Sequence, residues 1–172
     1  MKKTGLDISE RAKKIKLILL DVDGVMTDGS IILDSTGTEI KAFHVRDGHG
    51  IKMAQKAGLI IGIITGRNSK VVNIRARELG ITEVYQGTVD KGIVYAGIIA
   101  KYGLADEDVA FIGDDIVDIP ILRRVGLAVA VADADPGIRP YVHMITKSEG
   151  GRGAVREFIN FVLSTQGKLG IS

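Results

Sequence analysis

The chain has 172 residues, of which 45% are hydrophobic and 26% are charged. This composition excludes a disordered chain and suits one domain with a single hydrophobic core. The formal net charge is only +2, and its lysines and arginines are spread along the chain rather than gathered in a stripe, so we expect no nucleic-acid partner. There are no cysteines, which excludes disulfides and thiolate metal sites.

The sequence also argues against a membrane partner. It contains no run of about 20 apolar residues, and its first seven residues lack the apolar segment of a signal peptide. We therefore expect a cytoplasmic protein. No repeat, linker or low-complexity tract divides the chain, so a single domain over residues 1–172 is predicted.

Four short apolar runs predict strands that are buried on both faces. Their residues are continuously apolar instead of alternating, which is the pattern of a parallel sheet. The runs cover 17–20, 59–64, 109–112 and 127–131. Segments with helical spacing lie between and after them, at 47–57, 69–79, 91–102 and 116–125. A last strand at 142–146 and a last helix at 154–163 complete the alternation. This order predicts an α/β fold, a Rossmann-like open parallel sheet flanked by helices.

Two segments depart from this alternation. Residues 29–34 and 39–43 are extended in pattern and flank a turn, which predicts a β-hairpin inserted over about 29–43, after the first strand. Near the end of the chain, three glycines fall at positions 150, 151 and 153. Their spacing fits neither the P-loop nor the dinucleotide-binding loop. We therefore expect a flexible C-terminal tail over about 148–172.

Carboxylates follow two of the predicted strands, at the sheet edge where such folds place their sites. Asp21 and Asp23 follow the first strand, and because they are two apart in extended chain, both project to the same side. Asp114 and Asp115 follow the third run. Crowded carboxylates repel one another, and Mg²⁺, which prefers oxygen ligands, relieves that repulsion. The sequence therefore predicts a magnesium site at this edge.

Phosphate donors accompany these carboxylates. Thr65 follows the second run and Lys91 opens a helix, which supplies a hydroxyl and a positive charge for phosphate oxygens. Asp21 is ionised at neutral pH and can attack phosphorus. Each motif alone is usually a turn, a helix cap or a solvated charge. Their combination, in this order at strand ends and a helix start, favours phosphoryl chemistry.

These motifs resemble those of the haloacid dehalogenase superfamily phosphatases. The resemblance rests on Asp21-Val22-Asp23-Gly24-Val25, Thr65, Lys91 and Gly113-Asp114-Asp115 with Asp118. It implies that Asp21 is the nucleophile, which forms an aspartyl-phosphate, and that Asp23 is the general acid/base.

The same resemblance implies binding roles for the remaining motif residues. Those that bind phosphate would be Thr65, Gly66 and Lys91. Those that bind Mg²⁺ would be Asp21, Asp23 through its backbone carbonyl, and Asp114. Asp115 and Asp118 would support Lys91 and the metal-bound waters.

A narrower resemblance covers about residues 15–161. Asp21 to Gly29 with the hairpin after it, Phe43 to Gly48, and Gly150 to Glu157 are similar to the 3-deoxy-D-manno-octulosonate 8-phosphate phosphatases. This implies a capless phosphatase of that sugar phosphate in lipopolysaccharide biosynthesis, assembled as a homotetramer. Three alternatives stay open: a phosphatase for a nine-carbon keto-acid sugar 9-phosphate, a phospho-receiver domain, and a catalytically silent regulatory homologue. The receiver is disfavoured because Thr65, and no aspartate, follows the second run.

Three arginines are candidates for reading the substrate's carboxylate, since Arg pairs bidentately with such groups. Arg46 and Arg67 lie next to the predicted pocket, with solvated surface charge as the alternative for each. Glycines surround Arg152, so we expect the tail to present it to the active site of a neighbouring subunit. The alternative is a C-terminal helix that packs on its own subunit.

The hairpin is the predicted assembly element. Ile31, Leu33 and Phe43 fall on a two-stranded ribbon that is too small to bury them. An exposed apolar ribbon invites pairing with another chain, and symmetric closure would cover it. We therefore expect the homotetramer to be built through the hairpin.

Overall fold

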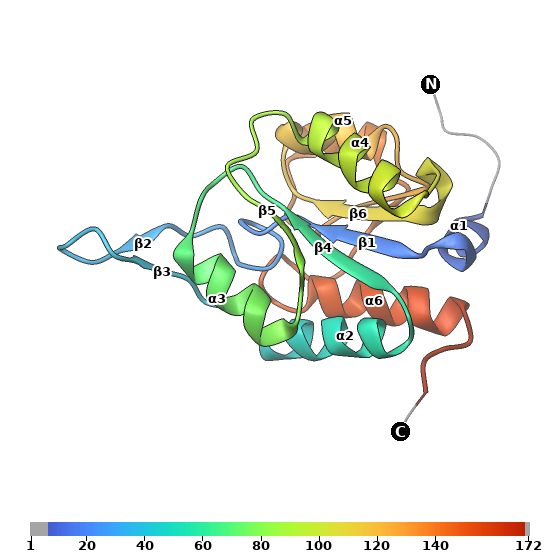
Figure 1. Cartoon of the computed structure of the whole chain (residues 1–172), viewed down its shortest axis with the longest axis horizontal. Helices are drawn as coiled ribbons and strands as arrows, with labels where there is room; N and C mark the ends of the chain where they lie inside the picture. The colour runs from blue at the N-terminus through green and yellow to red at the C-terminus, as the bar shows by residue number, and fades with distance from the viewer. Residues whose placement is uncertain (1–6, 171–172) are drawn as a thin grey trace.

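The structure, a computed structural model, describes residues 7–170. Its central sheet contains six parallel strands in the order β5-β4-β1-β6-β7-β8, with helices on both faces (Figure 1). The strands are β1 (Leu17–Leu20), β4 (Ile60–Ile64), β5 (Glu83–Tyr85), β6 (Val109–Gly113), β7 (Leu127–Ala130) and β8 (Met144–Ile145). This sheet confirms the predicted Rossmann-like fold.

Helices form a layer on each face of the sheet. They are α1 (Ile8–Lys14), α2 (Val45–Lys56), α3 (Lys70–Leu79), α4 (Lys91–Tyr102), α5 (Ile119–Leu122) and α6 (Ala154–Thr165). Helices α1, α2, α3 and α6 contribute to one buried cluster, whereas α4 and α5 contribute to another. Within residues 7–170 no helix combines the length and apolarity needed to cross a membrane.

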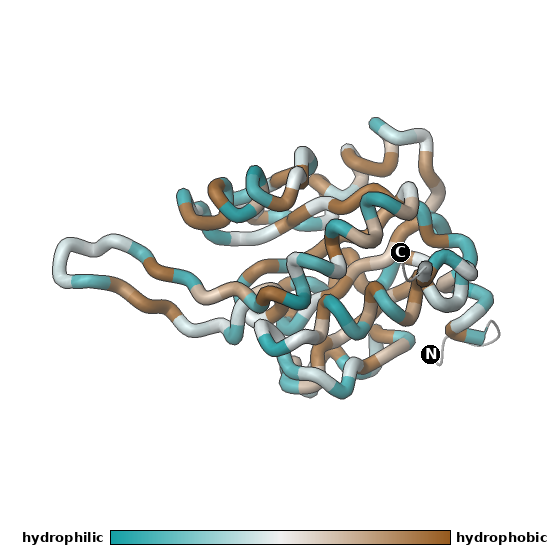
Figure 2. The backbone as a smooth tube through the Cα atoms, turned by 90° about the horizontal axis from the view of Figure 1, so that it is seen from below, coloured by the Kyte–Doolittle hydropathy of each residue, from teal (hydrophilic) through white to brown (hydrophobic). Residues whose placement is uncertain are grey.

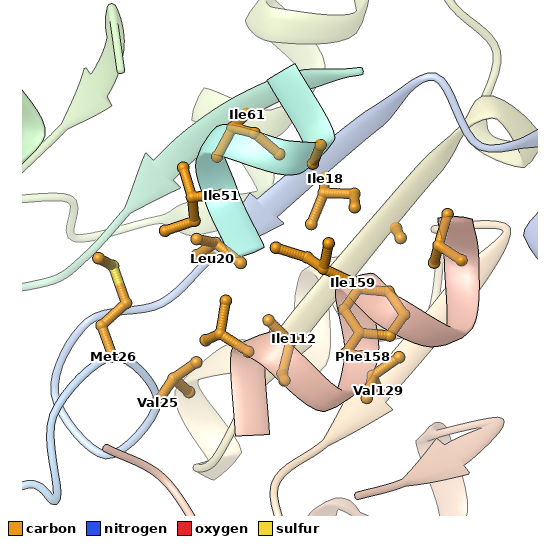
Figure 3. Close-up of a cluster of buried hydrophobic side chains, with 14 of the residues drawn as sticks. Ile18, Leu20, Val25, Met26, Ile51, Ile61, Ile112, Val129, Phe158 and Ile159 are labelled. Atoms are coloured by element: carbon orange, nitrogen blue, oxygen red, sulfur yellow. The ribbon is translucent and has the colours of Figure 1, made fainter. Parts of the chain in front are cut away.

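The two clusters lie on opposite faces of β1. Ile18 and Leu20 belong to the cluster under α2 and α6, and Leu17 and Leu19 belong to the other. Successive side chains of a strand point to opposite faces, so a strand buried on both sides has no polar position. This explains the continuous apolar run, and Figure 3 shows the first cluster between the sheet and helix α6.

The hairpin extends away from the body of the protein (Figures 1 and 2). Its strands, β2 (Ile32–Leu33) and β3 (Glu39–Ile40), pair antiparallel. Several of its apolar side chains are exposed: Ile31, Ile32, Leu33 and Ile40. The hairpin therefore presents apolar surface that this chain alone does not cover.

Phe43, which we expected on the ribbon, lies elsewhere. It follows β3 and packs, partly buried, against the hydrophobic cluster under α2 and α6. The guanidinium carbon of Arg75 lies 5.6 Å from its ring centroid. The chain turns back to the body within three residues of Ile40, so Phe43 belongs to the core rather than to the exposed ribbon.

Three elements differ from the sequence reading. The helix expected over 116–125 is a 3₁₀ turn, Ile116–Asp118, followed by the short α5, in which Pro120 lacks a backbone donor. Helix α1 is too poor in buried residues to show a periodic pattern, since only Ala12 is buried. Strand β5 has three residues and begins with the buried Glu83, so no apolar run marks it.

The segment 148–170, expected to be a flexible tail, contains α6 and its approach. The helix buries an apolar face against its own chain: Ala154, Val155, Phe158, Ile159, Val162 and Leu163. Its most extensive helix partner is α2 (Figure 1). The carboxylate of Asp47, on α2, accepts the backbone N–H of Arg156 at 2.8 Å and so secures the start of α6.

Candidate active site

Sheet register brings the motif residues together at one edge. Strand β1 lies between β4 and β6, and Leu20 pairs with Ile63 on one side and Ile112 on the other. Asp21 follows β1 directly, and Asp114 follows β6. Because parallel strands end at the same edge, residues far apart in the sequence meet there.

Three carboxylates meet at this edge. One oxygen each from Asp21, Asp114 and Asp118 lies within 4.8 Å of the others. Burial raises the pKa of Asp21, and the neighbouring Asp118 charge adds to the rise. Burial and the Asp21 charge likewise raise the pKa of Asp114. Shared buried charge of this kind is what a hard divalent cation compensates, so the residues present fit Mg²⁺.

Asp118 already has partners of its own. Its Oδ1 accepts a hydrogen bond from Lys91 Nζ at 2.6 Å, and its Oδ2 accepts from the backbone N–H of Asp114 at 3.0 Å. The side chain is fully buried. Asp118 therefore holds both Lys91 and the turn after β6, while Asp21 and Asp114 retain the oxygens best suited to a metal ion.

Lys91 lies between two of these carboxylates. It is the first residue of α4, whose start is fixed by Asp90, which accepts from the backbone N–H of Gly92 at 2.8 Å. Its Nζ lies 3.0 Å from Asp21 Oδ1, without the geometry of a hydrogen bond. Burial alone would lower the pKa of Lys91, but the charges of Asp21 and Asp118 outweigh it and raise this pKa. Lys91 is therefore a fixed cation beside Asp21.

Asp23 is held by a residue that the sequence reading missed. Its Oδ1 accepts from the Nζ of Lys41, whose side chain is only 1% exposed. The same Nζ lies 3.2 Å from Glu39 Oε1. In the sequence, Glu39-Ile40-Lys41 reads as ordinary alternation along a hairpin strand, so no local signal marks Lys41 as part of a site.

Glu39 links the base of the hairpin to the loop after β4. It accepts from Arg67 Nη2 at 2.9 Å and from Ser69 Oγ at 2.5 Å. Ser69 in turn caps α3 by accepting from the backbone N–H of Val72 at 3.4 Å. Arg67 is thereby connected, through Glu39 and Lys41, to Asp23.

The remaining candidates sit at different distances from this centre. Thr65 is buried at the end of β4, and its backbone N–H bonds to the carbonyl of Tyr85 at 2.9 Å. Gly66 follows it and is exposed. Asp115 is also exposed and caps the turn of Ile116. Thus Thr65 and Gly66 flank the carboxylates from the neighbouring strand end.

Within residues 7–170, two of the arginines make no ion pair with Asp21, Asp114 or Asp118. Arg46 is exposed in the first turn of α2 and forms no ion pair with an acidic residue within 7–170. Arg152 is 66% exposed at its side chain, and its Nη2 lies 3.9 Å from Oδ2 of Asp28 in the same chain. Of the three arginines, Arg67 has the most direct connection to the site.

The C-terminal glycines pack against the loop that follows Asp21. A Cβ on Gly150 would lie 1.8 Å from the carbonyl oxygen of Gly24. The backbone N–H of Gly151 donates a hydrogen bond to the carbonyl oxygen of Val25 at 2.9 Å. Gly24 itself has φ +85°, and a Cβ there would lie 2.0 Å from Asp114. The glycines therefore permit close packing of loops around the site, a role that differs from the flexibility that the sequence predicts.

A cavity of about 600 Å³ lies elsewhere, between the outer surfaces of α2 and α6. Lys52, Lys56 and Arg156 are among its lining residues. None of the residues at the strand ends contributes to it. We assign the site from the buried carboxylates and Lys91, because their chemistry and not the size of a cavity identifies it.

The comparisons with known proteins point in the same direction. A family model described as haloacid dehalogenase-like hydrolase matches residues 60–159. The 3-deoxy-D-manno-octulosonate 8-phosphate phosphatase of Escherichia coli is 47% identical over 163 residues, which are 95% of this chain and 87% of that protein. The enzyme of the same name from Yersinia pestis is 48% identical over the same shares of both chains.

Solved structures agree in fold and in length. The Yersinia pestis phosphatase superposes with a TM-score of 0.93 at 48% identity and covers 94% of this chain and 88% of its own. The Moraxella catarrhalis phosphatase, in complex with magnesium, phosphate and KDO, has a TM-score of 0.91 at 42% identity. It covers 93% of this chain and 92% of its own.

Proposed function

This chain belongs to the haloacid dehalogenase-like hydrolases, and we propose that it hydrolyses 3-deoxy-D-manno-octulosonate 8-phosphate to the free sugar acid and phosphate. The observation that carries the reaction is the pairing of Asp21 and Asp114 at adjoining strand ends, with the buried Lys91 beside Asp21. The substrate rests on relatives of that name, which match nearly the whole chain.

Mg²⁺ is the cofactor of this reaction in our proposal. Asp21, Asp114 and the backbone carbonyl of Asp23 would hold it. When bound, such an ion neutralises negative charge on the phosphate and so favours attack by an anion. The raised pKa values of Asp21 and Asp114 support this assignment, because burial makes both carboxylates costly to ionise even with Lys91 beside Asp21, so an added cation would stabilise them.

Asp21 is the nucleophile in the first half-reaction. Its carboxylate oxygen attacks phosphorus, the bond from phosphorus to the sugar oxygen breaks, and the electron pair stays on that oxygen. Asp23 donates a proton to it, so the sugar leaves as an alcohol. In the second half-reaction Asp23 takes a proton from water as the water attacks phosphorus, which releases Asp21 and phosphate.

The neighbouring residues bind the transferring phosphoryl group. Lys91 is fixed by Asp118 at 2.6 Å, so its charge is in place before the substrate arrives. Thr65 and Gly66 would donate from the end of β4. Preorganised donors of this kind act where negative charge develops.

A panel of sugar phosphates tests the substrate. Phosphate release is measured with the eight-carbon keto-acid 8-phosphate, a nine-carbon keto-acid 9-phosphate and hexose phosphates, with Mg²⁺ or with excess chelator. We expect the highest kcat/KM with the eight-carbon acid and no turnover in chelator. A preference for the nine-carbon acid would replace the proposed substrate, and turnover in excess chelator would refute the metal requirement.

Arg67 and Arg152 are the proposed contacts for the substrate's carboxylate. Arg67 is favoured by its connection to Asp23 through Glu39 and Lys41. For each arginine, substitution by alanine should raise KM for the sugar acid phosphate and leave an aryl phosphate without a carboxylate nearly unaffected. Arg46→Ala, at an exposed position outside these contacts, is the matched control.

We also propose a cytoplasmic homotetramer assembled through the hairpin. The exposed side chains of Ile31 and Leu33, 62% and 57% accessible, support this because a lone chain leaves them in water. Light scattering should give a tetramer for the wild type and smaller species for Ile31→Lys combined with Leu33→Lys. Thr36→Lys, at the hairpin turn, should leave assembly unchanged, and a monomeric wild type would refute the proposal.

A further inference from the structure

Lys41 is a buried charge that the reaction described above leaves without a role. It follows β3 at the base of the hairpin, and its side chain is 1% exposed. Lysine is almost never buried so fully unless its ammonium group is paired. The Nζ has two carboxylate partners, Asp23 Oδ1 and, at 3.2 Å, Glu39 Oε1. One of these partners is the proposed acid/base of the reaction.

We propose that Lys41 is a positioning residue that orients the carboxyl group of Asp23 toward the leaving oxygen of the substrate. This inference rests on the proposed function, in which Asp23 exchanges a proton with the sugar oxygen. Lys41 occupies Oδ1 and leaves Oδ2 for that exchange. Lys41 itself is not a catalytic residue, because it acts through Asp23.

The exposure of Asp23 explains why such a residue is needed. Its side chain is 23% exposed, and within residues 7–170 the contact with Lys41 is the one hydrogen bond that it makes. Rotation about its side-chain bonds would otherwise move both oxygens among several staggered positions. A displacement of about 1 Å at a reacting group can slow a reaction roughly a hundredfold.

Glu39 gives Lys41 a fixed position. Its Oε1 binds the Lys41 ammonium at 3.2 Å and accepts from Arg67 at 2.9 Å, and its Oε2 accepts from Ser69 at 2.5 Å. The base of the hairpin is thereby tied to the loop after β4, although the ribbon beyond it projects from the body (Figure 2). Lys41 thus reaches Asp23 from an anchored point.

Two phosphate esters with different leaving groups distinguish a loss of acid catalysis by Asp23 from a general loss of activity. A simple alkyl phosphate releases an alkoxide that must be protonated, whereas p-nitrophenyl phosphate releases a stable phenolate that needs no acid. The ratio kcat/KM reports the steps up to release of the alcohol, so later hydrolysis of the aspartyl-phosphate does not enter. For Lys41→Met we expect a loss of about a hundredfold on the alkyl ester and less than about threefold on the aryl ester.

Three further variants serve as references. Asp23→Asn should show the same selective loss, and more strongly. Lys41→Arg keeps the charge and should recover part of the alkyl activity. Lys16→Met removes a lysine whose side chain is 63% exposed and which pairs with Asp108 at 2.9 Å, before β1. The Lys16→Met variant should have the wild-type kcat/KM on both the alkyl and the aryl ester.

The outcomes distinguish the proposals from one another. Equal losses on both esters, or no loss on either, for Lys41→Met would overturn the positioning role. An Asp23→Asn variant without selectivity would overturn both the acid/base role of Asp23 and the inference built on it. A wild type that hydrolyses alkyl phosphates but not the octulosonate phosphate would refute only the substrate, and the comparison of esters would still decide the role of Lys41.

A second measurement does not depend on turnover. Thermal unfolding of the metal-free protein is recorded for Lys41→Met, Asp23→Asn and the double variant. If the two side chains form one interaction, the shifts in Tm will not add, and the double variant will melt no lower than Lys41→Met. Additive shifts would mean that Lys41 does not act on Asp23, and would overturn the inference.

Discussion

Two buried lysines face the proposed catalytic aspartates from different kinds of structure. Lys91 begins a twelve-residue helix and contacts Asp118 and Asp21. Lys41 follows a two-residue strand at the base of a projecting hairpin and contacts Asp23. Both side chains are nearly inaccessible, at 4% and 1%. Helix α4 and the irregular segment after β3 therefore each place a fixed ammonium group beside a carboxylate.

The difference lies in what each lysine serves. Lys91 lies beside Asp21, so in our proposal its charge acts on the phosphoryl group, which every substrate shares. Lys41 lies beside Asp23, so its effect depends on whether the leaving oxygen needs a proton. The two lysines should consequently be distinguished by substrate and not only by the size of the loss.

The largest expected loss of activity is that of Asp21→Asn, and the losses of the lysine variants should be smaller. Asp21→Asn removes the nucleophile, and kcat/KM should fall at least roughly a thousandfold, or about 4 kcal/mol, on alkyl and aryl phosphates alike. The loss is independent of the leaving group because bond formation to phosphorus is itself lost. Steady-state kinetics on both esters measures this, and an active Asp21→Asn protein would contradict the mechanism.

Lys91→Met should produce the next largest effect and the clearest contrast with Lys41→Met. We expect kcat/KM to fall by about a hundredfold to a thousandfold on both esters, since a preorganised charge on the phosphoryl group is lost. Stability should also fall by about 3 kcal/mol, because the fully buried Asp118 loses the ammonium group that balances its charge. Urea unfolding measures the second effect, and a loss confined to the alkyl ester would assign Lys91 the role proposed for Lys41.

A smaller effect is expected from Gly150→Ala, which leaves both lysines in place. The added Cβ would overlap the carbonyl oxygen of Gly24, so the loop that follows Asp21 must shift. We expect a loss of about tenfold in kcat/KM on both esters, since the displacement affects Asp21 and Asp23 together. Gly97→Ala, on α4 with nothing within 4 Å of an added Cβ, is the control. Unchanged kinetics for Gly150→Ala would mean that the two loops adjust independently.

The smallest expected effect concerns a buried carboxylate outside the site, Glu83, and its three hydrogen-bond donors. Glu83 accepts from Lys101 and Tyr102, each at 2.6 Å, and from Tyr85 at 2.7 Å. Burial alone would raise the pKa of Glu83, but these hydrogen bonds outweigh it and lower this pKa. Glu83→Gln should reduce stability by about 1 to 2 kcal/mol and leave kcat/KM unchanged on both esters.

The sign of the pKa shift fixes the pH dependence of that loss. A lowered folded-state pKa contributes stability that is fully present above the ordinary value of 4.5 and is lost as pH falls through the folded value. The gap in urea midpoint between wild type and Glu83→Gln should therefore be largest near neutral pH and shrink below about pH 4. A gap that widens in acid would contradict the assigned cause.

The sequence predicted the regular parts of this protein because they leave periodic signals. Continuous apolar runs located β1, β4, β6 and β7, and sheet geometry then implied that Asp21 and Asp114 would meet. Strand β5 escaped prediction because a buried charge begins it. Lys41 escaped because its partners are distant in the sequence, and burial of a lysine depends on contacts that no local pattern records.

Two predictions from the sequence missed a close contact. The glycines at 150 and 151 suggested a mobile tail, and Phe43 suggested an exposed ribbon. In the structure each occupies a close contact: the glycines allow two loops to touch, and Phe43 packs on the core with Arg75. Glycine permits both freedom and close approach, and a sequence alone does not say which of the two is used.

The central position of β1 in the sheet also determines when the site can assemble during translation of the chain. Its two neighbours, β4 and β6, are both made later, and β6 emerges from the ribosome only after well over half of the chain. A nascent chain that stops before β6 carries Asp21 and Thr65 but neither Asp114 nor Asp118. Long-range parallel pairing of this kind also closes slowly. The carboxylate cluster at the strand ends therefore cannot assemble until β6 and the turn after it have been made.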